Sequence, residues 1–154
     1  MSGICGSCGL AVEGGSEGCQ RLLESIGLRE YEDMRFARYH RAVVDVYAMQ
    51  HPDRYGRSAK SFAAHLTGLS AWLEDESRAP VVNASVQRWL SGPSPIDRPE
   101  LPASYGAVTI RELVDETDPV RYGHTLRRWA RSTWDAYAPL HGIARGWIAL
   151  ALAK

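Results

Sequence analysis

Two cysteines near the start of the chain have the spacing of half a zinc site. Cys5 and Cys8 are separated by two residues, and Gly9 follows directly. The turn between two such cysteines brings both sulfur atoms to one side, where they can share a tetrahedral ion, and the glycine permits the positive φ that turns backbone amides towards sulfur. The alternatives are a cytosolic redox pair and two cysteines without a chemical role. Because no βαβ pattern surrounds the motif, we predict a metal site.

Sulfur alone cannot complete this site. Cys19 is the third and last cysteine of the chain, and no second CxxC motif occurs. A fourth ligand would therefore have to be a histidine. The sequence leaves open what Cys19 does, and whether cysteines and histidines form one site or two.

Three of the five histidines fall on faces that should point into the core. His40, His65 and His141 each recur with apolar and aromatic residues at steps of three and four, on three different predicted helices. A shared metal ion would satisfy all three imidazoles at once, and helical bundles build metal sites from facing helices. The alternative is a separate hydrogen bond from each histidine to a tyrosine, an aspartate or the backbone. We predict that at most four ligands bind at once from this pool: Cys5, Cys8, His40, His65 and His141.

Polar residues near His40 could handle protons beside such a metal. Asp45 lies about a quarter turn from the core stripe, where it could orient a ligating histidine or act as a general base on metal-bound water. His51 is a second candidate for the proton, and Tyr47 could orient it. The alternative for Asp45 is a surface ion pair with Arg41 or Arg38. The predicted catalytic residues are Asp45, His51 and Tyr47.

The elements that must position these residues are predicted to be helices only. No segment alternates with period two, and no internal repeat occurs. We predict a single domain over residues 1–154, an all-α bundle of about five to six helices with an N-terminal Cys-containing loop (1–15) and a long proline-rich crossing (93–106). The helices are expected at about 19–26, 29–50, 58–76, 80–92 and from 118 onwards, the last with a kink near Pro139, and a short one near 109–112. Gly27 should end the first of them, and Ser58 and Asp118 should cap the starts of the helices at 58 and 118.

Composition excludes several partners. The chain has 18 basic and 18 acidic residues, so its zero net charge gives no reason to expect nucleic acid or an anionic membrane as a partner. No stretch resembles a signal peptide or approaches a transmembrane span of about 18 apolar residues. We therefore expect a cytoplasmic protein with a small-molecule substrate. The oligomeric state is open.

Several motifs together resemble an uncharacterised bacterial family of unknown function. They are the CxxCG head at residues 5–9, the YHxxxVDxYxxQHP centre at residues 39–52, and the WAxSxW tail at residues 129–134 followed by His141. Members of that family also carry a Gly-Cys pair that corresponds to Gly18-Cys19, although this chain has Gln20 where they often have tryptophan. The inward histidines are also similar in arrangement to those of DinB-like metal proteins, which is an architectural analogy. The family resemblance implies no activity.

The sequence supports three hypotheses. The leading one is a small mononuclear zinc enzyme, a hydrolase, lyase or isomerase in which metal-bound water acts on a small substrate. The second is a non-catalytic regulatory or redox-sensing protein with a structural zinc knuckle, in which the histidines belong to the core. The third is a copper-handling protein, which three cysteines and several histidines could support.

Overall fold

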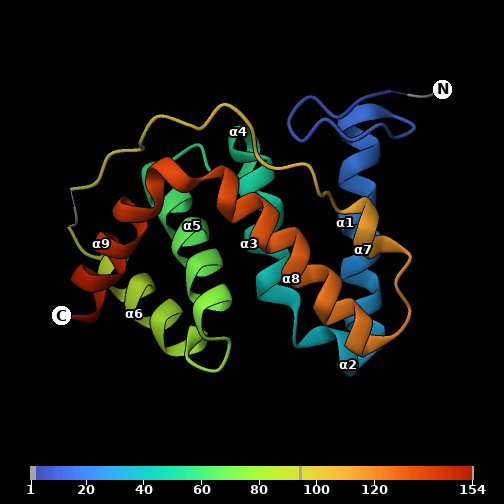
Figure 1. The fold of residues 1–154 in the computed structure, drawn as a ribbon. Helices are drawn as coiled ribbons and strands as arrows, with labels where there is room; N and C mark the ends of the chain where they lie inside the picture. Colours follow the sequence, from blue (N-terminus) through green and yellow to red (C-terminus); the bar gives the residue numbers. More distant parts are fainter. Residues whose placement is uncertain (1–2, 94, 154) are drawn as a thin grey trace.

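The computed structural model describes residues 3–93 and 95–153, and this part of the chain is all-α, as predicted (Figure 1). Residues 1–2 of the predicted N-terminal loop and residue 94 of the predicted crossing lie outside the described residues, as does residue 154. Six described helices have seven or more residues: α1 (Gly15–Glu32), α3 (His40–Gln50), α5 (Ala59–Glu74), α6 (Ala79–Ser91), α8 (Pro119–Ala136) and α9 (His141–Leu152). Shorter ones connect them: α2 (Met34–Ala37), α4 (Pro52–Tyr55), α7 (Arg111–Val114) and the 3-10 turn η1 (Ala138–Leu140).

Two helices begin where their capping residues predict. The Ser58 side chain accepts a hydrogen bond from the Ser61 amide at the start of α5. The Asp118 side chain does the same for the Arg121 amide at the start of α8, with Pro119 as the first helical residue. In both cases a side-chain oxygen satisfies an amide that has no partner within the helix.

Several predicted helix boundaries differ from the structure, and the first helix already begins at Gly15 rather than near residue 19. Gly27 does not end the first helix, because α1 continues to Glu32. The predicted helix over 29–50 is divided instead at Asp33, which is extended and caps α2 with its side chain, and again before His40. The predicted kink near Pro139 is a full interruption by η1, since a proline cannot donate the amide that a continuous helix needs there.

The core is centred on α3, which packs against α5 and α8, while α6 and α9 cover the far side of α5 (Figure 1). Gln50, at the last position of α3, is fully buried and anchors the irregular segment that leads to α7. Its amide group donates to the carbonyls of Tyr105 and Val108 at 3.0 and 2.7 Å, and its carbonyl oxygen accepts from the Trp129 indole at 2.8 Å. These bonds hold the end of α3, and therefore the residue that follows it, in one position.

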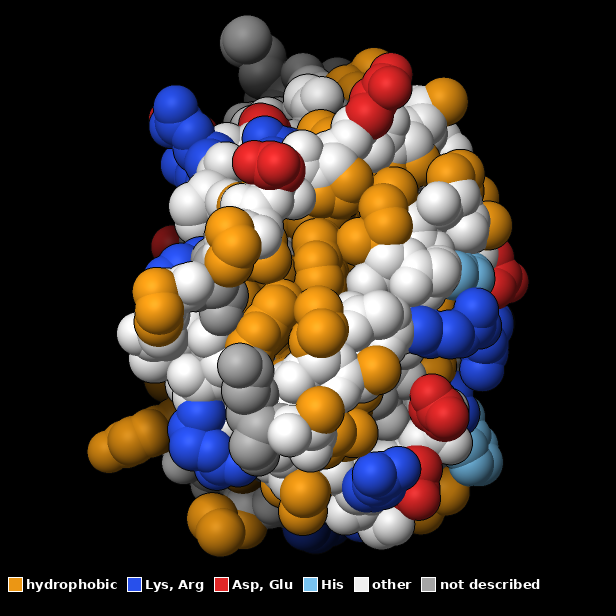
Figure 2. Space-filling view, turned by 90° about the vertical axis from the view of Figure 1, so that its left-hand side faces the viewer, with side chains coloured by type: hydrophobic (Ala, Val, Ile, Leu, Met, Phe, Trp, Pro, Cys, Tyr) orange, Lys and Arg blue, Asp and Glu red, His pale blue; other side chains and the backbone are white. Residues whose placement is uncertain are grey.

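Hydrophobic side chains gather in a furrow on the face where α6 and α9 lie (Figure 2). A pocket of about 400 Å³ opens there, with Trp89, Pro93, Pro95 and Ala151 in its lining. None of the described helices combines the length and the apolar character needed to cross a membrane.

Candidate metal centre

The N-terminal segment folds into a short hairpin that presents two sulfur atoms. Gly3 and Val12 exchange backbone hydrogen bonds of 3.1 and 2.9 Å, and the Cys5 amide donates to the Leu10 carbonyl at 2.8 Å. At the tip, Gly9 has a φ of 79°, as the sequence predicts. This conformation, which is easy only for glycine, closes the turn after Cys8. Amides of the turn then point at sulfur: those of Ser7 and Cys8 at Cys5, and that of Leu10 at Cys8.

The first turns of α1 supply a third sulfur atom. Cys19 is completely buried, and its Sγ lies 3.9 Å from that of Cys8. The residue before it must be glycine, because a Cβ at Gly18 would lie 1.9 Å from the Glu13 carbonyl oxygen of the hairpin. The close approach of the hairpin to the start of α1 therefore depends on the pair Gly18-Cys19.

A histidine at the end of α3 faces these sulfur atoms. His51 is 5% exposed, and its Nδ1 lies 2.7 Å from the carbonyl oxygen of Tyr47. A carbonyl can only accept, so Nδ1 carries a proton; as a metal ligand the ring would be neutral and would offer the lone pair of Nε2. This Nε2 lies 3.5 Å from Cys5 Sγ and 3.4 Å from Cys19 Sγ. The Tyr47 ring stacks on the imidazole at 3.8 Å, and its hydroxyl donates to Cys19 Sγ at 3.3 Å.

Cys5, Cys8, Cys19 and His51 lie close enough to hold a metal ion. One donor atom from each residue lies within 4.8 Å of all the others. In tetrahedral zinc, bonds of about 2.3 Å to sulfur and about 2.0 Å to nitrogen place sulfur atoms about 3.8 Å apart and a sulfur about 3.5 Å from the nitrogen. Three of the six separations in this group, 3.9 Å between Cys8 and Cys19 and 3.5 and 3.4 Å from His51 to Cys5 and Cys19, match these edges. We call this group of four residues the Cys3His centre.

The electrostatics of the centre favour a bound cation. The hydrogen bond from Cys8 is the largest influence on Cys19, and with further bonds from His51 and Tyr47 it lowers the pKa of the Cys19 thiol to about 4 despite burial. The same contact, together with burial, raises the pKa of Cys8 above its ordinary range. Burial opposes ionisation of Cys5, but the backbone amides that point at its sulfur lower its pKa overall. Negative charge thus collects among buried sulfur atoms, where a metal ion would stabilise it.

A small pocket lies beside the centre. Its volume is about 310 Å³, and Cys5, Tyr47 and His51 form part of its wall, together with Asp53 and Arg54. Asp53 also accepts a hydrogen bond of 2.5 Å from the Ser7 hydroxyl, which ties the hairpin to α4. The centre therefore borders a solvent-connected space on its α4 side.

The structure brings Cys5 and Cys8 together but does not bring them to His40, His65 and His141. Among the described residues, none of these three histidines belongs to a group that could share an ion. His40 is exposed rather than core-facing, because α3 begins at this residue, and its Nδ1 lies 2.5 Å from Glu30. His141 stacks on Trp134, and its Nε2 lies 2.7 Å from the Trp134 carbonyl oxygen. His40 and His141 therefore have separate partners, which was the alternative to a shared metal site.

His65 has a separate partner as well, and that partner is Asp45. His65 Nδ1 lies 2.9 Å from Asp45 Oδ1, and Arg41 Nε donates to both carboxylate oxygens at 3.0 and 2.9 Å. Asp45 is 1% exposed, so the ion pair that the sequence suggested with Arg41 is buried on the carboxylate side. Burial raises the pKa of Asp45, while His65 and Arg41 oppose this rise. Of the three predicted catalytic residues, only Tyr47 and His51 lie at the Cys3His centre.

Sequence reasoning did not assign His51 and Cys19 to the metal. A signal for both was present. Three cysteines leave one place for a histidine, and His51 ends a helix directly before Pro52, where its backbone is free to leave the helical conformation. The Gly18-Cys19 pair also belongs to the family pattern, and the structure shows that this glycine is what admits the hairpin.

The chain belongs to the family of unknown function DUF5946, whose sequence model matches residues 3–138. This match agrees with the resemblance to an uncharacterised family and covers all four residues of the Cys3His centre. Neither a search of curated proteins nor a search of solved structures gave a significant match.

Proposed function

We propose that this chain is a zinc protein in which Cys5, Cys8, Cys19 and His51 are the four ligands of a closed, structural site. The observation that supports it most is the convergence of four donor atoms within 4.8 Å of one another, with three of their six separations at the values of a tetrahedral zinc site. The donor set also favours zinc, since thiolate and imidazole are ligands that Zn²⁺ prefers, and three of the four residues are buried.

The zinc would act by joining three parts of the chain. The ligands come from the hairpin, from α1 and from the end of α3, so one ion would hold all three together. Four protein ligands leave no open position on a tetrahedral ion, which is the arrangement of structural sites and not of catalytic ones. The hydrogen bond from His51 Nδ1 to the Tyr47 carbonyl would fix the ligating ring, as second-layer partners do in zinc proteins. A reducing compartment such as the cytoplasm would keep the thiols available.

A second candidate is a zinc enzyme, and the pocket beside Cys5 and His51 favours it. Catalysis at this ion would require one ligand to give way to water, which would then be acidified by the metal. Glu17 and Asp53 are the carboxylates in the lining of that pocket, whereas Asp45 is held by Arg41 and His65. Glu17 or Asp53 would therefore replace Asp45 as the group that accepts a proton.

Metal analysis tests the proposal. The full chain, purified without a histidine tag, should contain one equivalent of zinc by elemental mass spectrometry, and its three cysteines should react with a thiol reagent only after a chelator is added. A protein that takes up no zinc when zinc is offered, and whose thiols react freely, would overturn the proposal.

Cobalt substitution separates the two candidates. In a closed site the visible spectrum of Co²⁺ should show thiolate bands that do not change when azide or thiocyanate is added, because no position is open to them. A spectral change that saturates with added azide would instead support an open, catalytic ion.

A further inference from the structure

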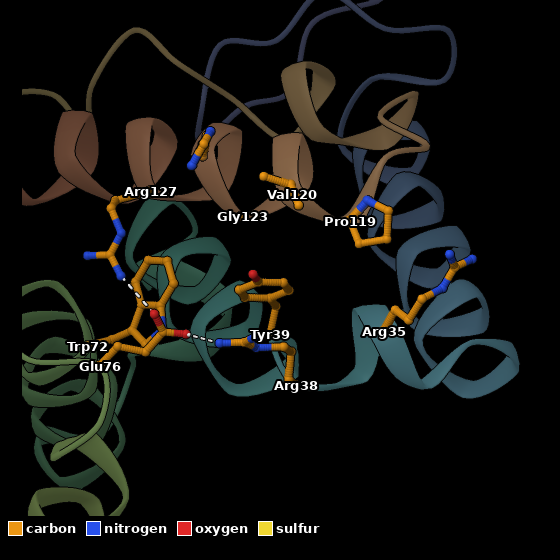
Figure 3. A pocket seen from close by; sticks show the side chains of 10 residues that line it. Arg35, Arg38, Tyr39, Trp72, Glu76, Pro119, Val120, Gly123 and Arg127 are labelled. Carbon is orange, nitrogen blue, oxygen red and sulfur yellow. Dashed lines mark hydrogen bonds and ion pairs between the residues drawn. The ribbon is translucent and has the colours of Figure 1, made fainter.

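A second pocket has three arginines in its lining, and none of its lining residues belongs to the Cys3His centre. It has a volume of about 490 Å³, within the range of about 300–1,000 Å³ that small-molecule sites occupy. Its walls come from α2 and the segment that follows it, from the end of α5 and from the first half of α8 (Figure 3). The charged or ionisable residues in its lining are Arg35, Arg38, Glu76, His124 and Arg127.

The arginines are not fully neutralised by the carboxylates near them. Arg35 is paired with Asp33 at 2.7 Å. Arg38 and Arg127 reach the same carboxylate, Glu76, from different elements, at 3.3 and 3.0 Å (Figure 3). Two guanidinium groups thus share one negative charge, and one positive charge remains. His124 adds a further polar group to the same wall.

Aromatic rings hold these guanidinium groups in place. The Arg127 guanidinium lies 4.4 Å from the centre of the Trp72 ring, and that of Arg38 lies 5.0 Å from the centre of the Tyr39 ring. Stacking of this kind orients the planar fork with which arginine binds a carboxylate or phosphate group. The arginine side chains are therefore partly ordered in the free protein, and they lose less conformational entropy when an anion binds.

An apolar wall completes the pocket. Pro119 and Val120 face it from the start of α8, and Gly123 allows Tyr39 to pack directly against that helix. A Cβ at Gly123 would lie 2.5 Å from the Tyr39 hydroxyl oxygen, so any other residue there would displace the ring. The pocket therefore combines positive charge with a flat aromatic and apolar surface.

We propose that this pocket binds a small organic anion in which a carboxylate or phosphate group is attached to a planar or apolar part. The anionic group would lie between Arg38 and Arg127, in competition with Glu76, and the apolar part would lie against Tyr39 and Val120. Glu76 is an internal competitor for the ligand, because it occupies the same two guanidinium groups in the structure. This site needs no residue of the proposed zinc site.

Calorimetric titration of the full-length, zinc-loaded protein with phenyl phosphate and benzoate tests the proposal. Inorganic phosphate and benzyl alcohol supply the anionic and the apolar part alone. We expect phenyl phosphate or benzoate to bind more tightly than either part, and the stronger of the two identifies the anionic group.

Three substitutions then assign the binding to this pocket. Arg127→Gln should weaken it about tenfold, the effect of losing one charge-assisted hydrogen bond of about 1.4 kcal/mol. Glu76→Gln should strengthen it, since the competing charge is removed. Arg128→Gln is the matched control: it makes the same change on the same helix, but Arg128 pairs with Glu112 and is not in the lining. Its affinity should stay within about twofold of the wild type, since its charge is exposed and screened by salt.

Three results would overturn the proposal: no binding of either aromatic anion at millimolar concentration, equal weakening by Arg127→Gln and Arg128→Gln, or weaker binding after Glu76→Gln. The first excludes a site, the second shows attraction by general surface charge, and the third makes Glu76 a ligand contact. Circular dichroism checks that each variant folds. If Arg127→Gln does not fold, Arg38→Gln replaces it with the same expected weakening.

Discussion

Two groups of polar side chains include residues from α3 or its C-terminal end, and they differ in the partners that their polar atoms have. Near its middle, Asp45 accepts hydrogen bonds from Arg41 and lies within hydrogen-bond distance of His65; we call these three residues the Asp45 cluster. At the end of the same helix, His51 faces three cysteines. In the Asp45 cluster donors meet an acceptor, so the group is complete as it stands. In the Cys3His centre three sulfur atoms and one imidazole nitrogen converge, and a bound cation would stabilise all four donor atoms together.

This difference shows which kind of buried polar group indicates a bound metal ion. Histidine on a core-facing stripe is ambiguous, because a carboxylate such as Asp45 satisfies it as well as a metal does. The convergence of three cysteine sulfur atoms and one histidine nitrogen, with no carboxylate in the group, indicates a metal site more specifically. The predictions below test this contrast, from the largest expected effect to the smallest.

Loss of one sulfur from the Cys3His centre should have the largest effect. In Cys19→Ser the three remaining donors of the proposed zinc site would hold the ion weakly, so the protein should contain much less than one equivalent. Its free energy of unfolding should fall by roughly 4 kcal/mol, a size typical of the loss of a metal. Elemental analysis and chemical denaturation measure the two quantities. Full zinc content in this variant would remove Cys19 from the ligand set.

Truncation in the Asp45 cluster should destabilise the protein without loss of zinc. Asp45→Ala leaves His65 and Arg41 without their acceptor and should cost about 3 kcal/mol by denaturation, with zinc content unchanged. Asp45→Asn should cost less, because burial disfavours the charged carboxylate and raises its pKa, and a neutral amide avoids that cost. Loss of zinc from either variant would mean that the two groups are coupled.

The fit between the hairpin and α1 can be tested at a single Cβ. Gly18→Ala places that atom 1.9 Å from the Glu13 carbonyl oxygen, so the hairpin must shift and zinc affinity should fall, at a cost of about 2 kcal/mol in stability. Gly27→Ala, on the same helix, meets no atom within 4 Å and should stabilise the protein by about 0.5–1 kcal/mol. Competition with a zinc chelator measures the affinities. Equal behaviour of the two variants would contradict the close packing described for Gly18.

His141→Ala should have the smallest effect. It removes one hydrogen bond to the Trp134 carbonyl and a stacking contact, so a loss of about 1 kcal/mol and one full equivalent of zinc are expected. The comparison with Cys8→Ser, which should lose the metal, is the informative one. If zinc were lost from His141→Ala and retained in Cys8→Ser, the shared histidine site that the sequence suggested would have to be restored.

The all-α class, the caps at Ser58 and Asp118 and the turn at Gly9 could all be predicted from the sequence. Each depends on residues that are close along the chain: apolar steps of three and four, a side-chain oxygen next to its own amide, and a glycine that tolerates positive φ. Boundaries inside the stretch 29–50 were wrong because a local pattern does not show that the backbone turns extended at Asp33. Cys5 and Cys8 were found as candidate ligands for the same local reason.

The rest of the site was decided by tertiary structure. His51 is 32 residues from Cys19 and 46 from Cys5, and no periodicity relates them. They meet because Gly18 admits the hairpin to α1 and because the bonds of Gln50 fix the end of α3. In the same way, only packing revealed that Asp45 takes His65 as its partner, and that two arginines from different elements share Glu76. The sequence alone determined which residues could do chemistry, since that depends on their types; the fold determined which of them act together, since that depends on distances across the core.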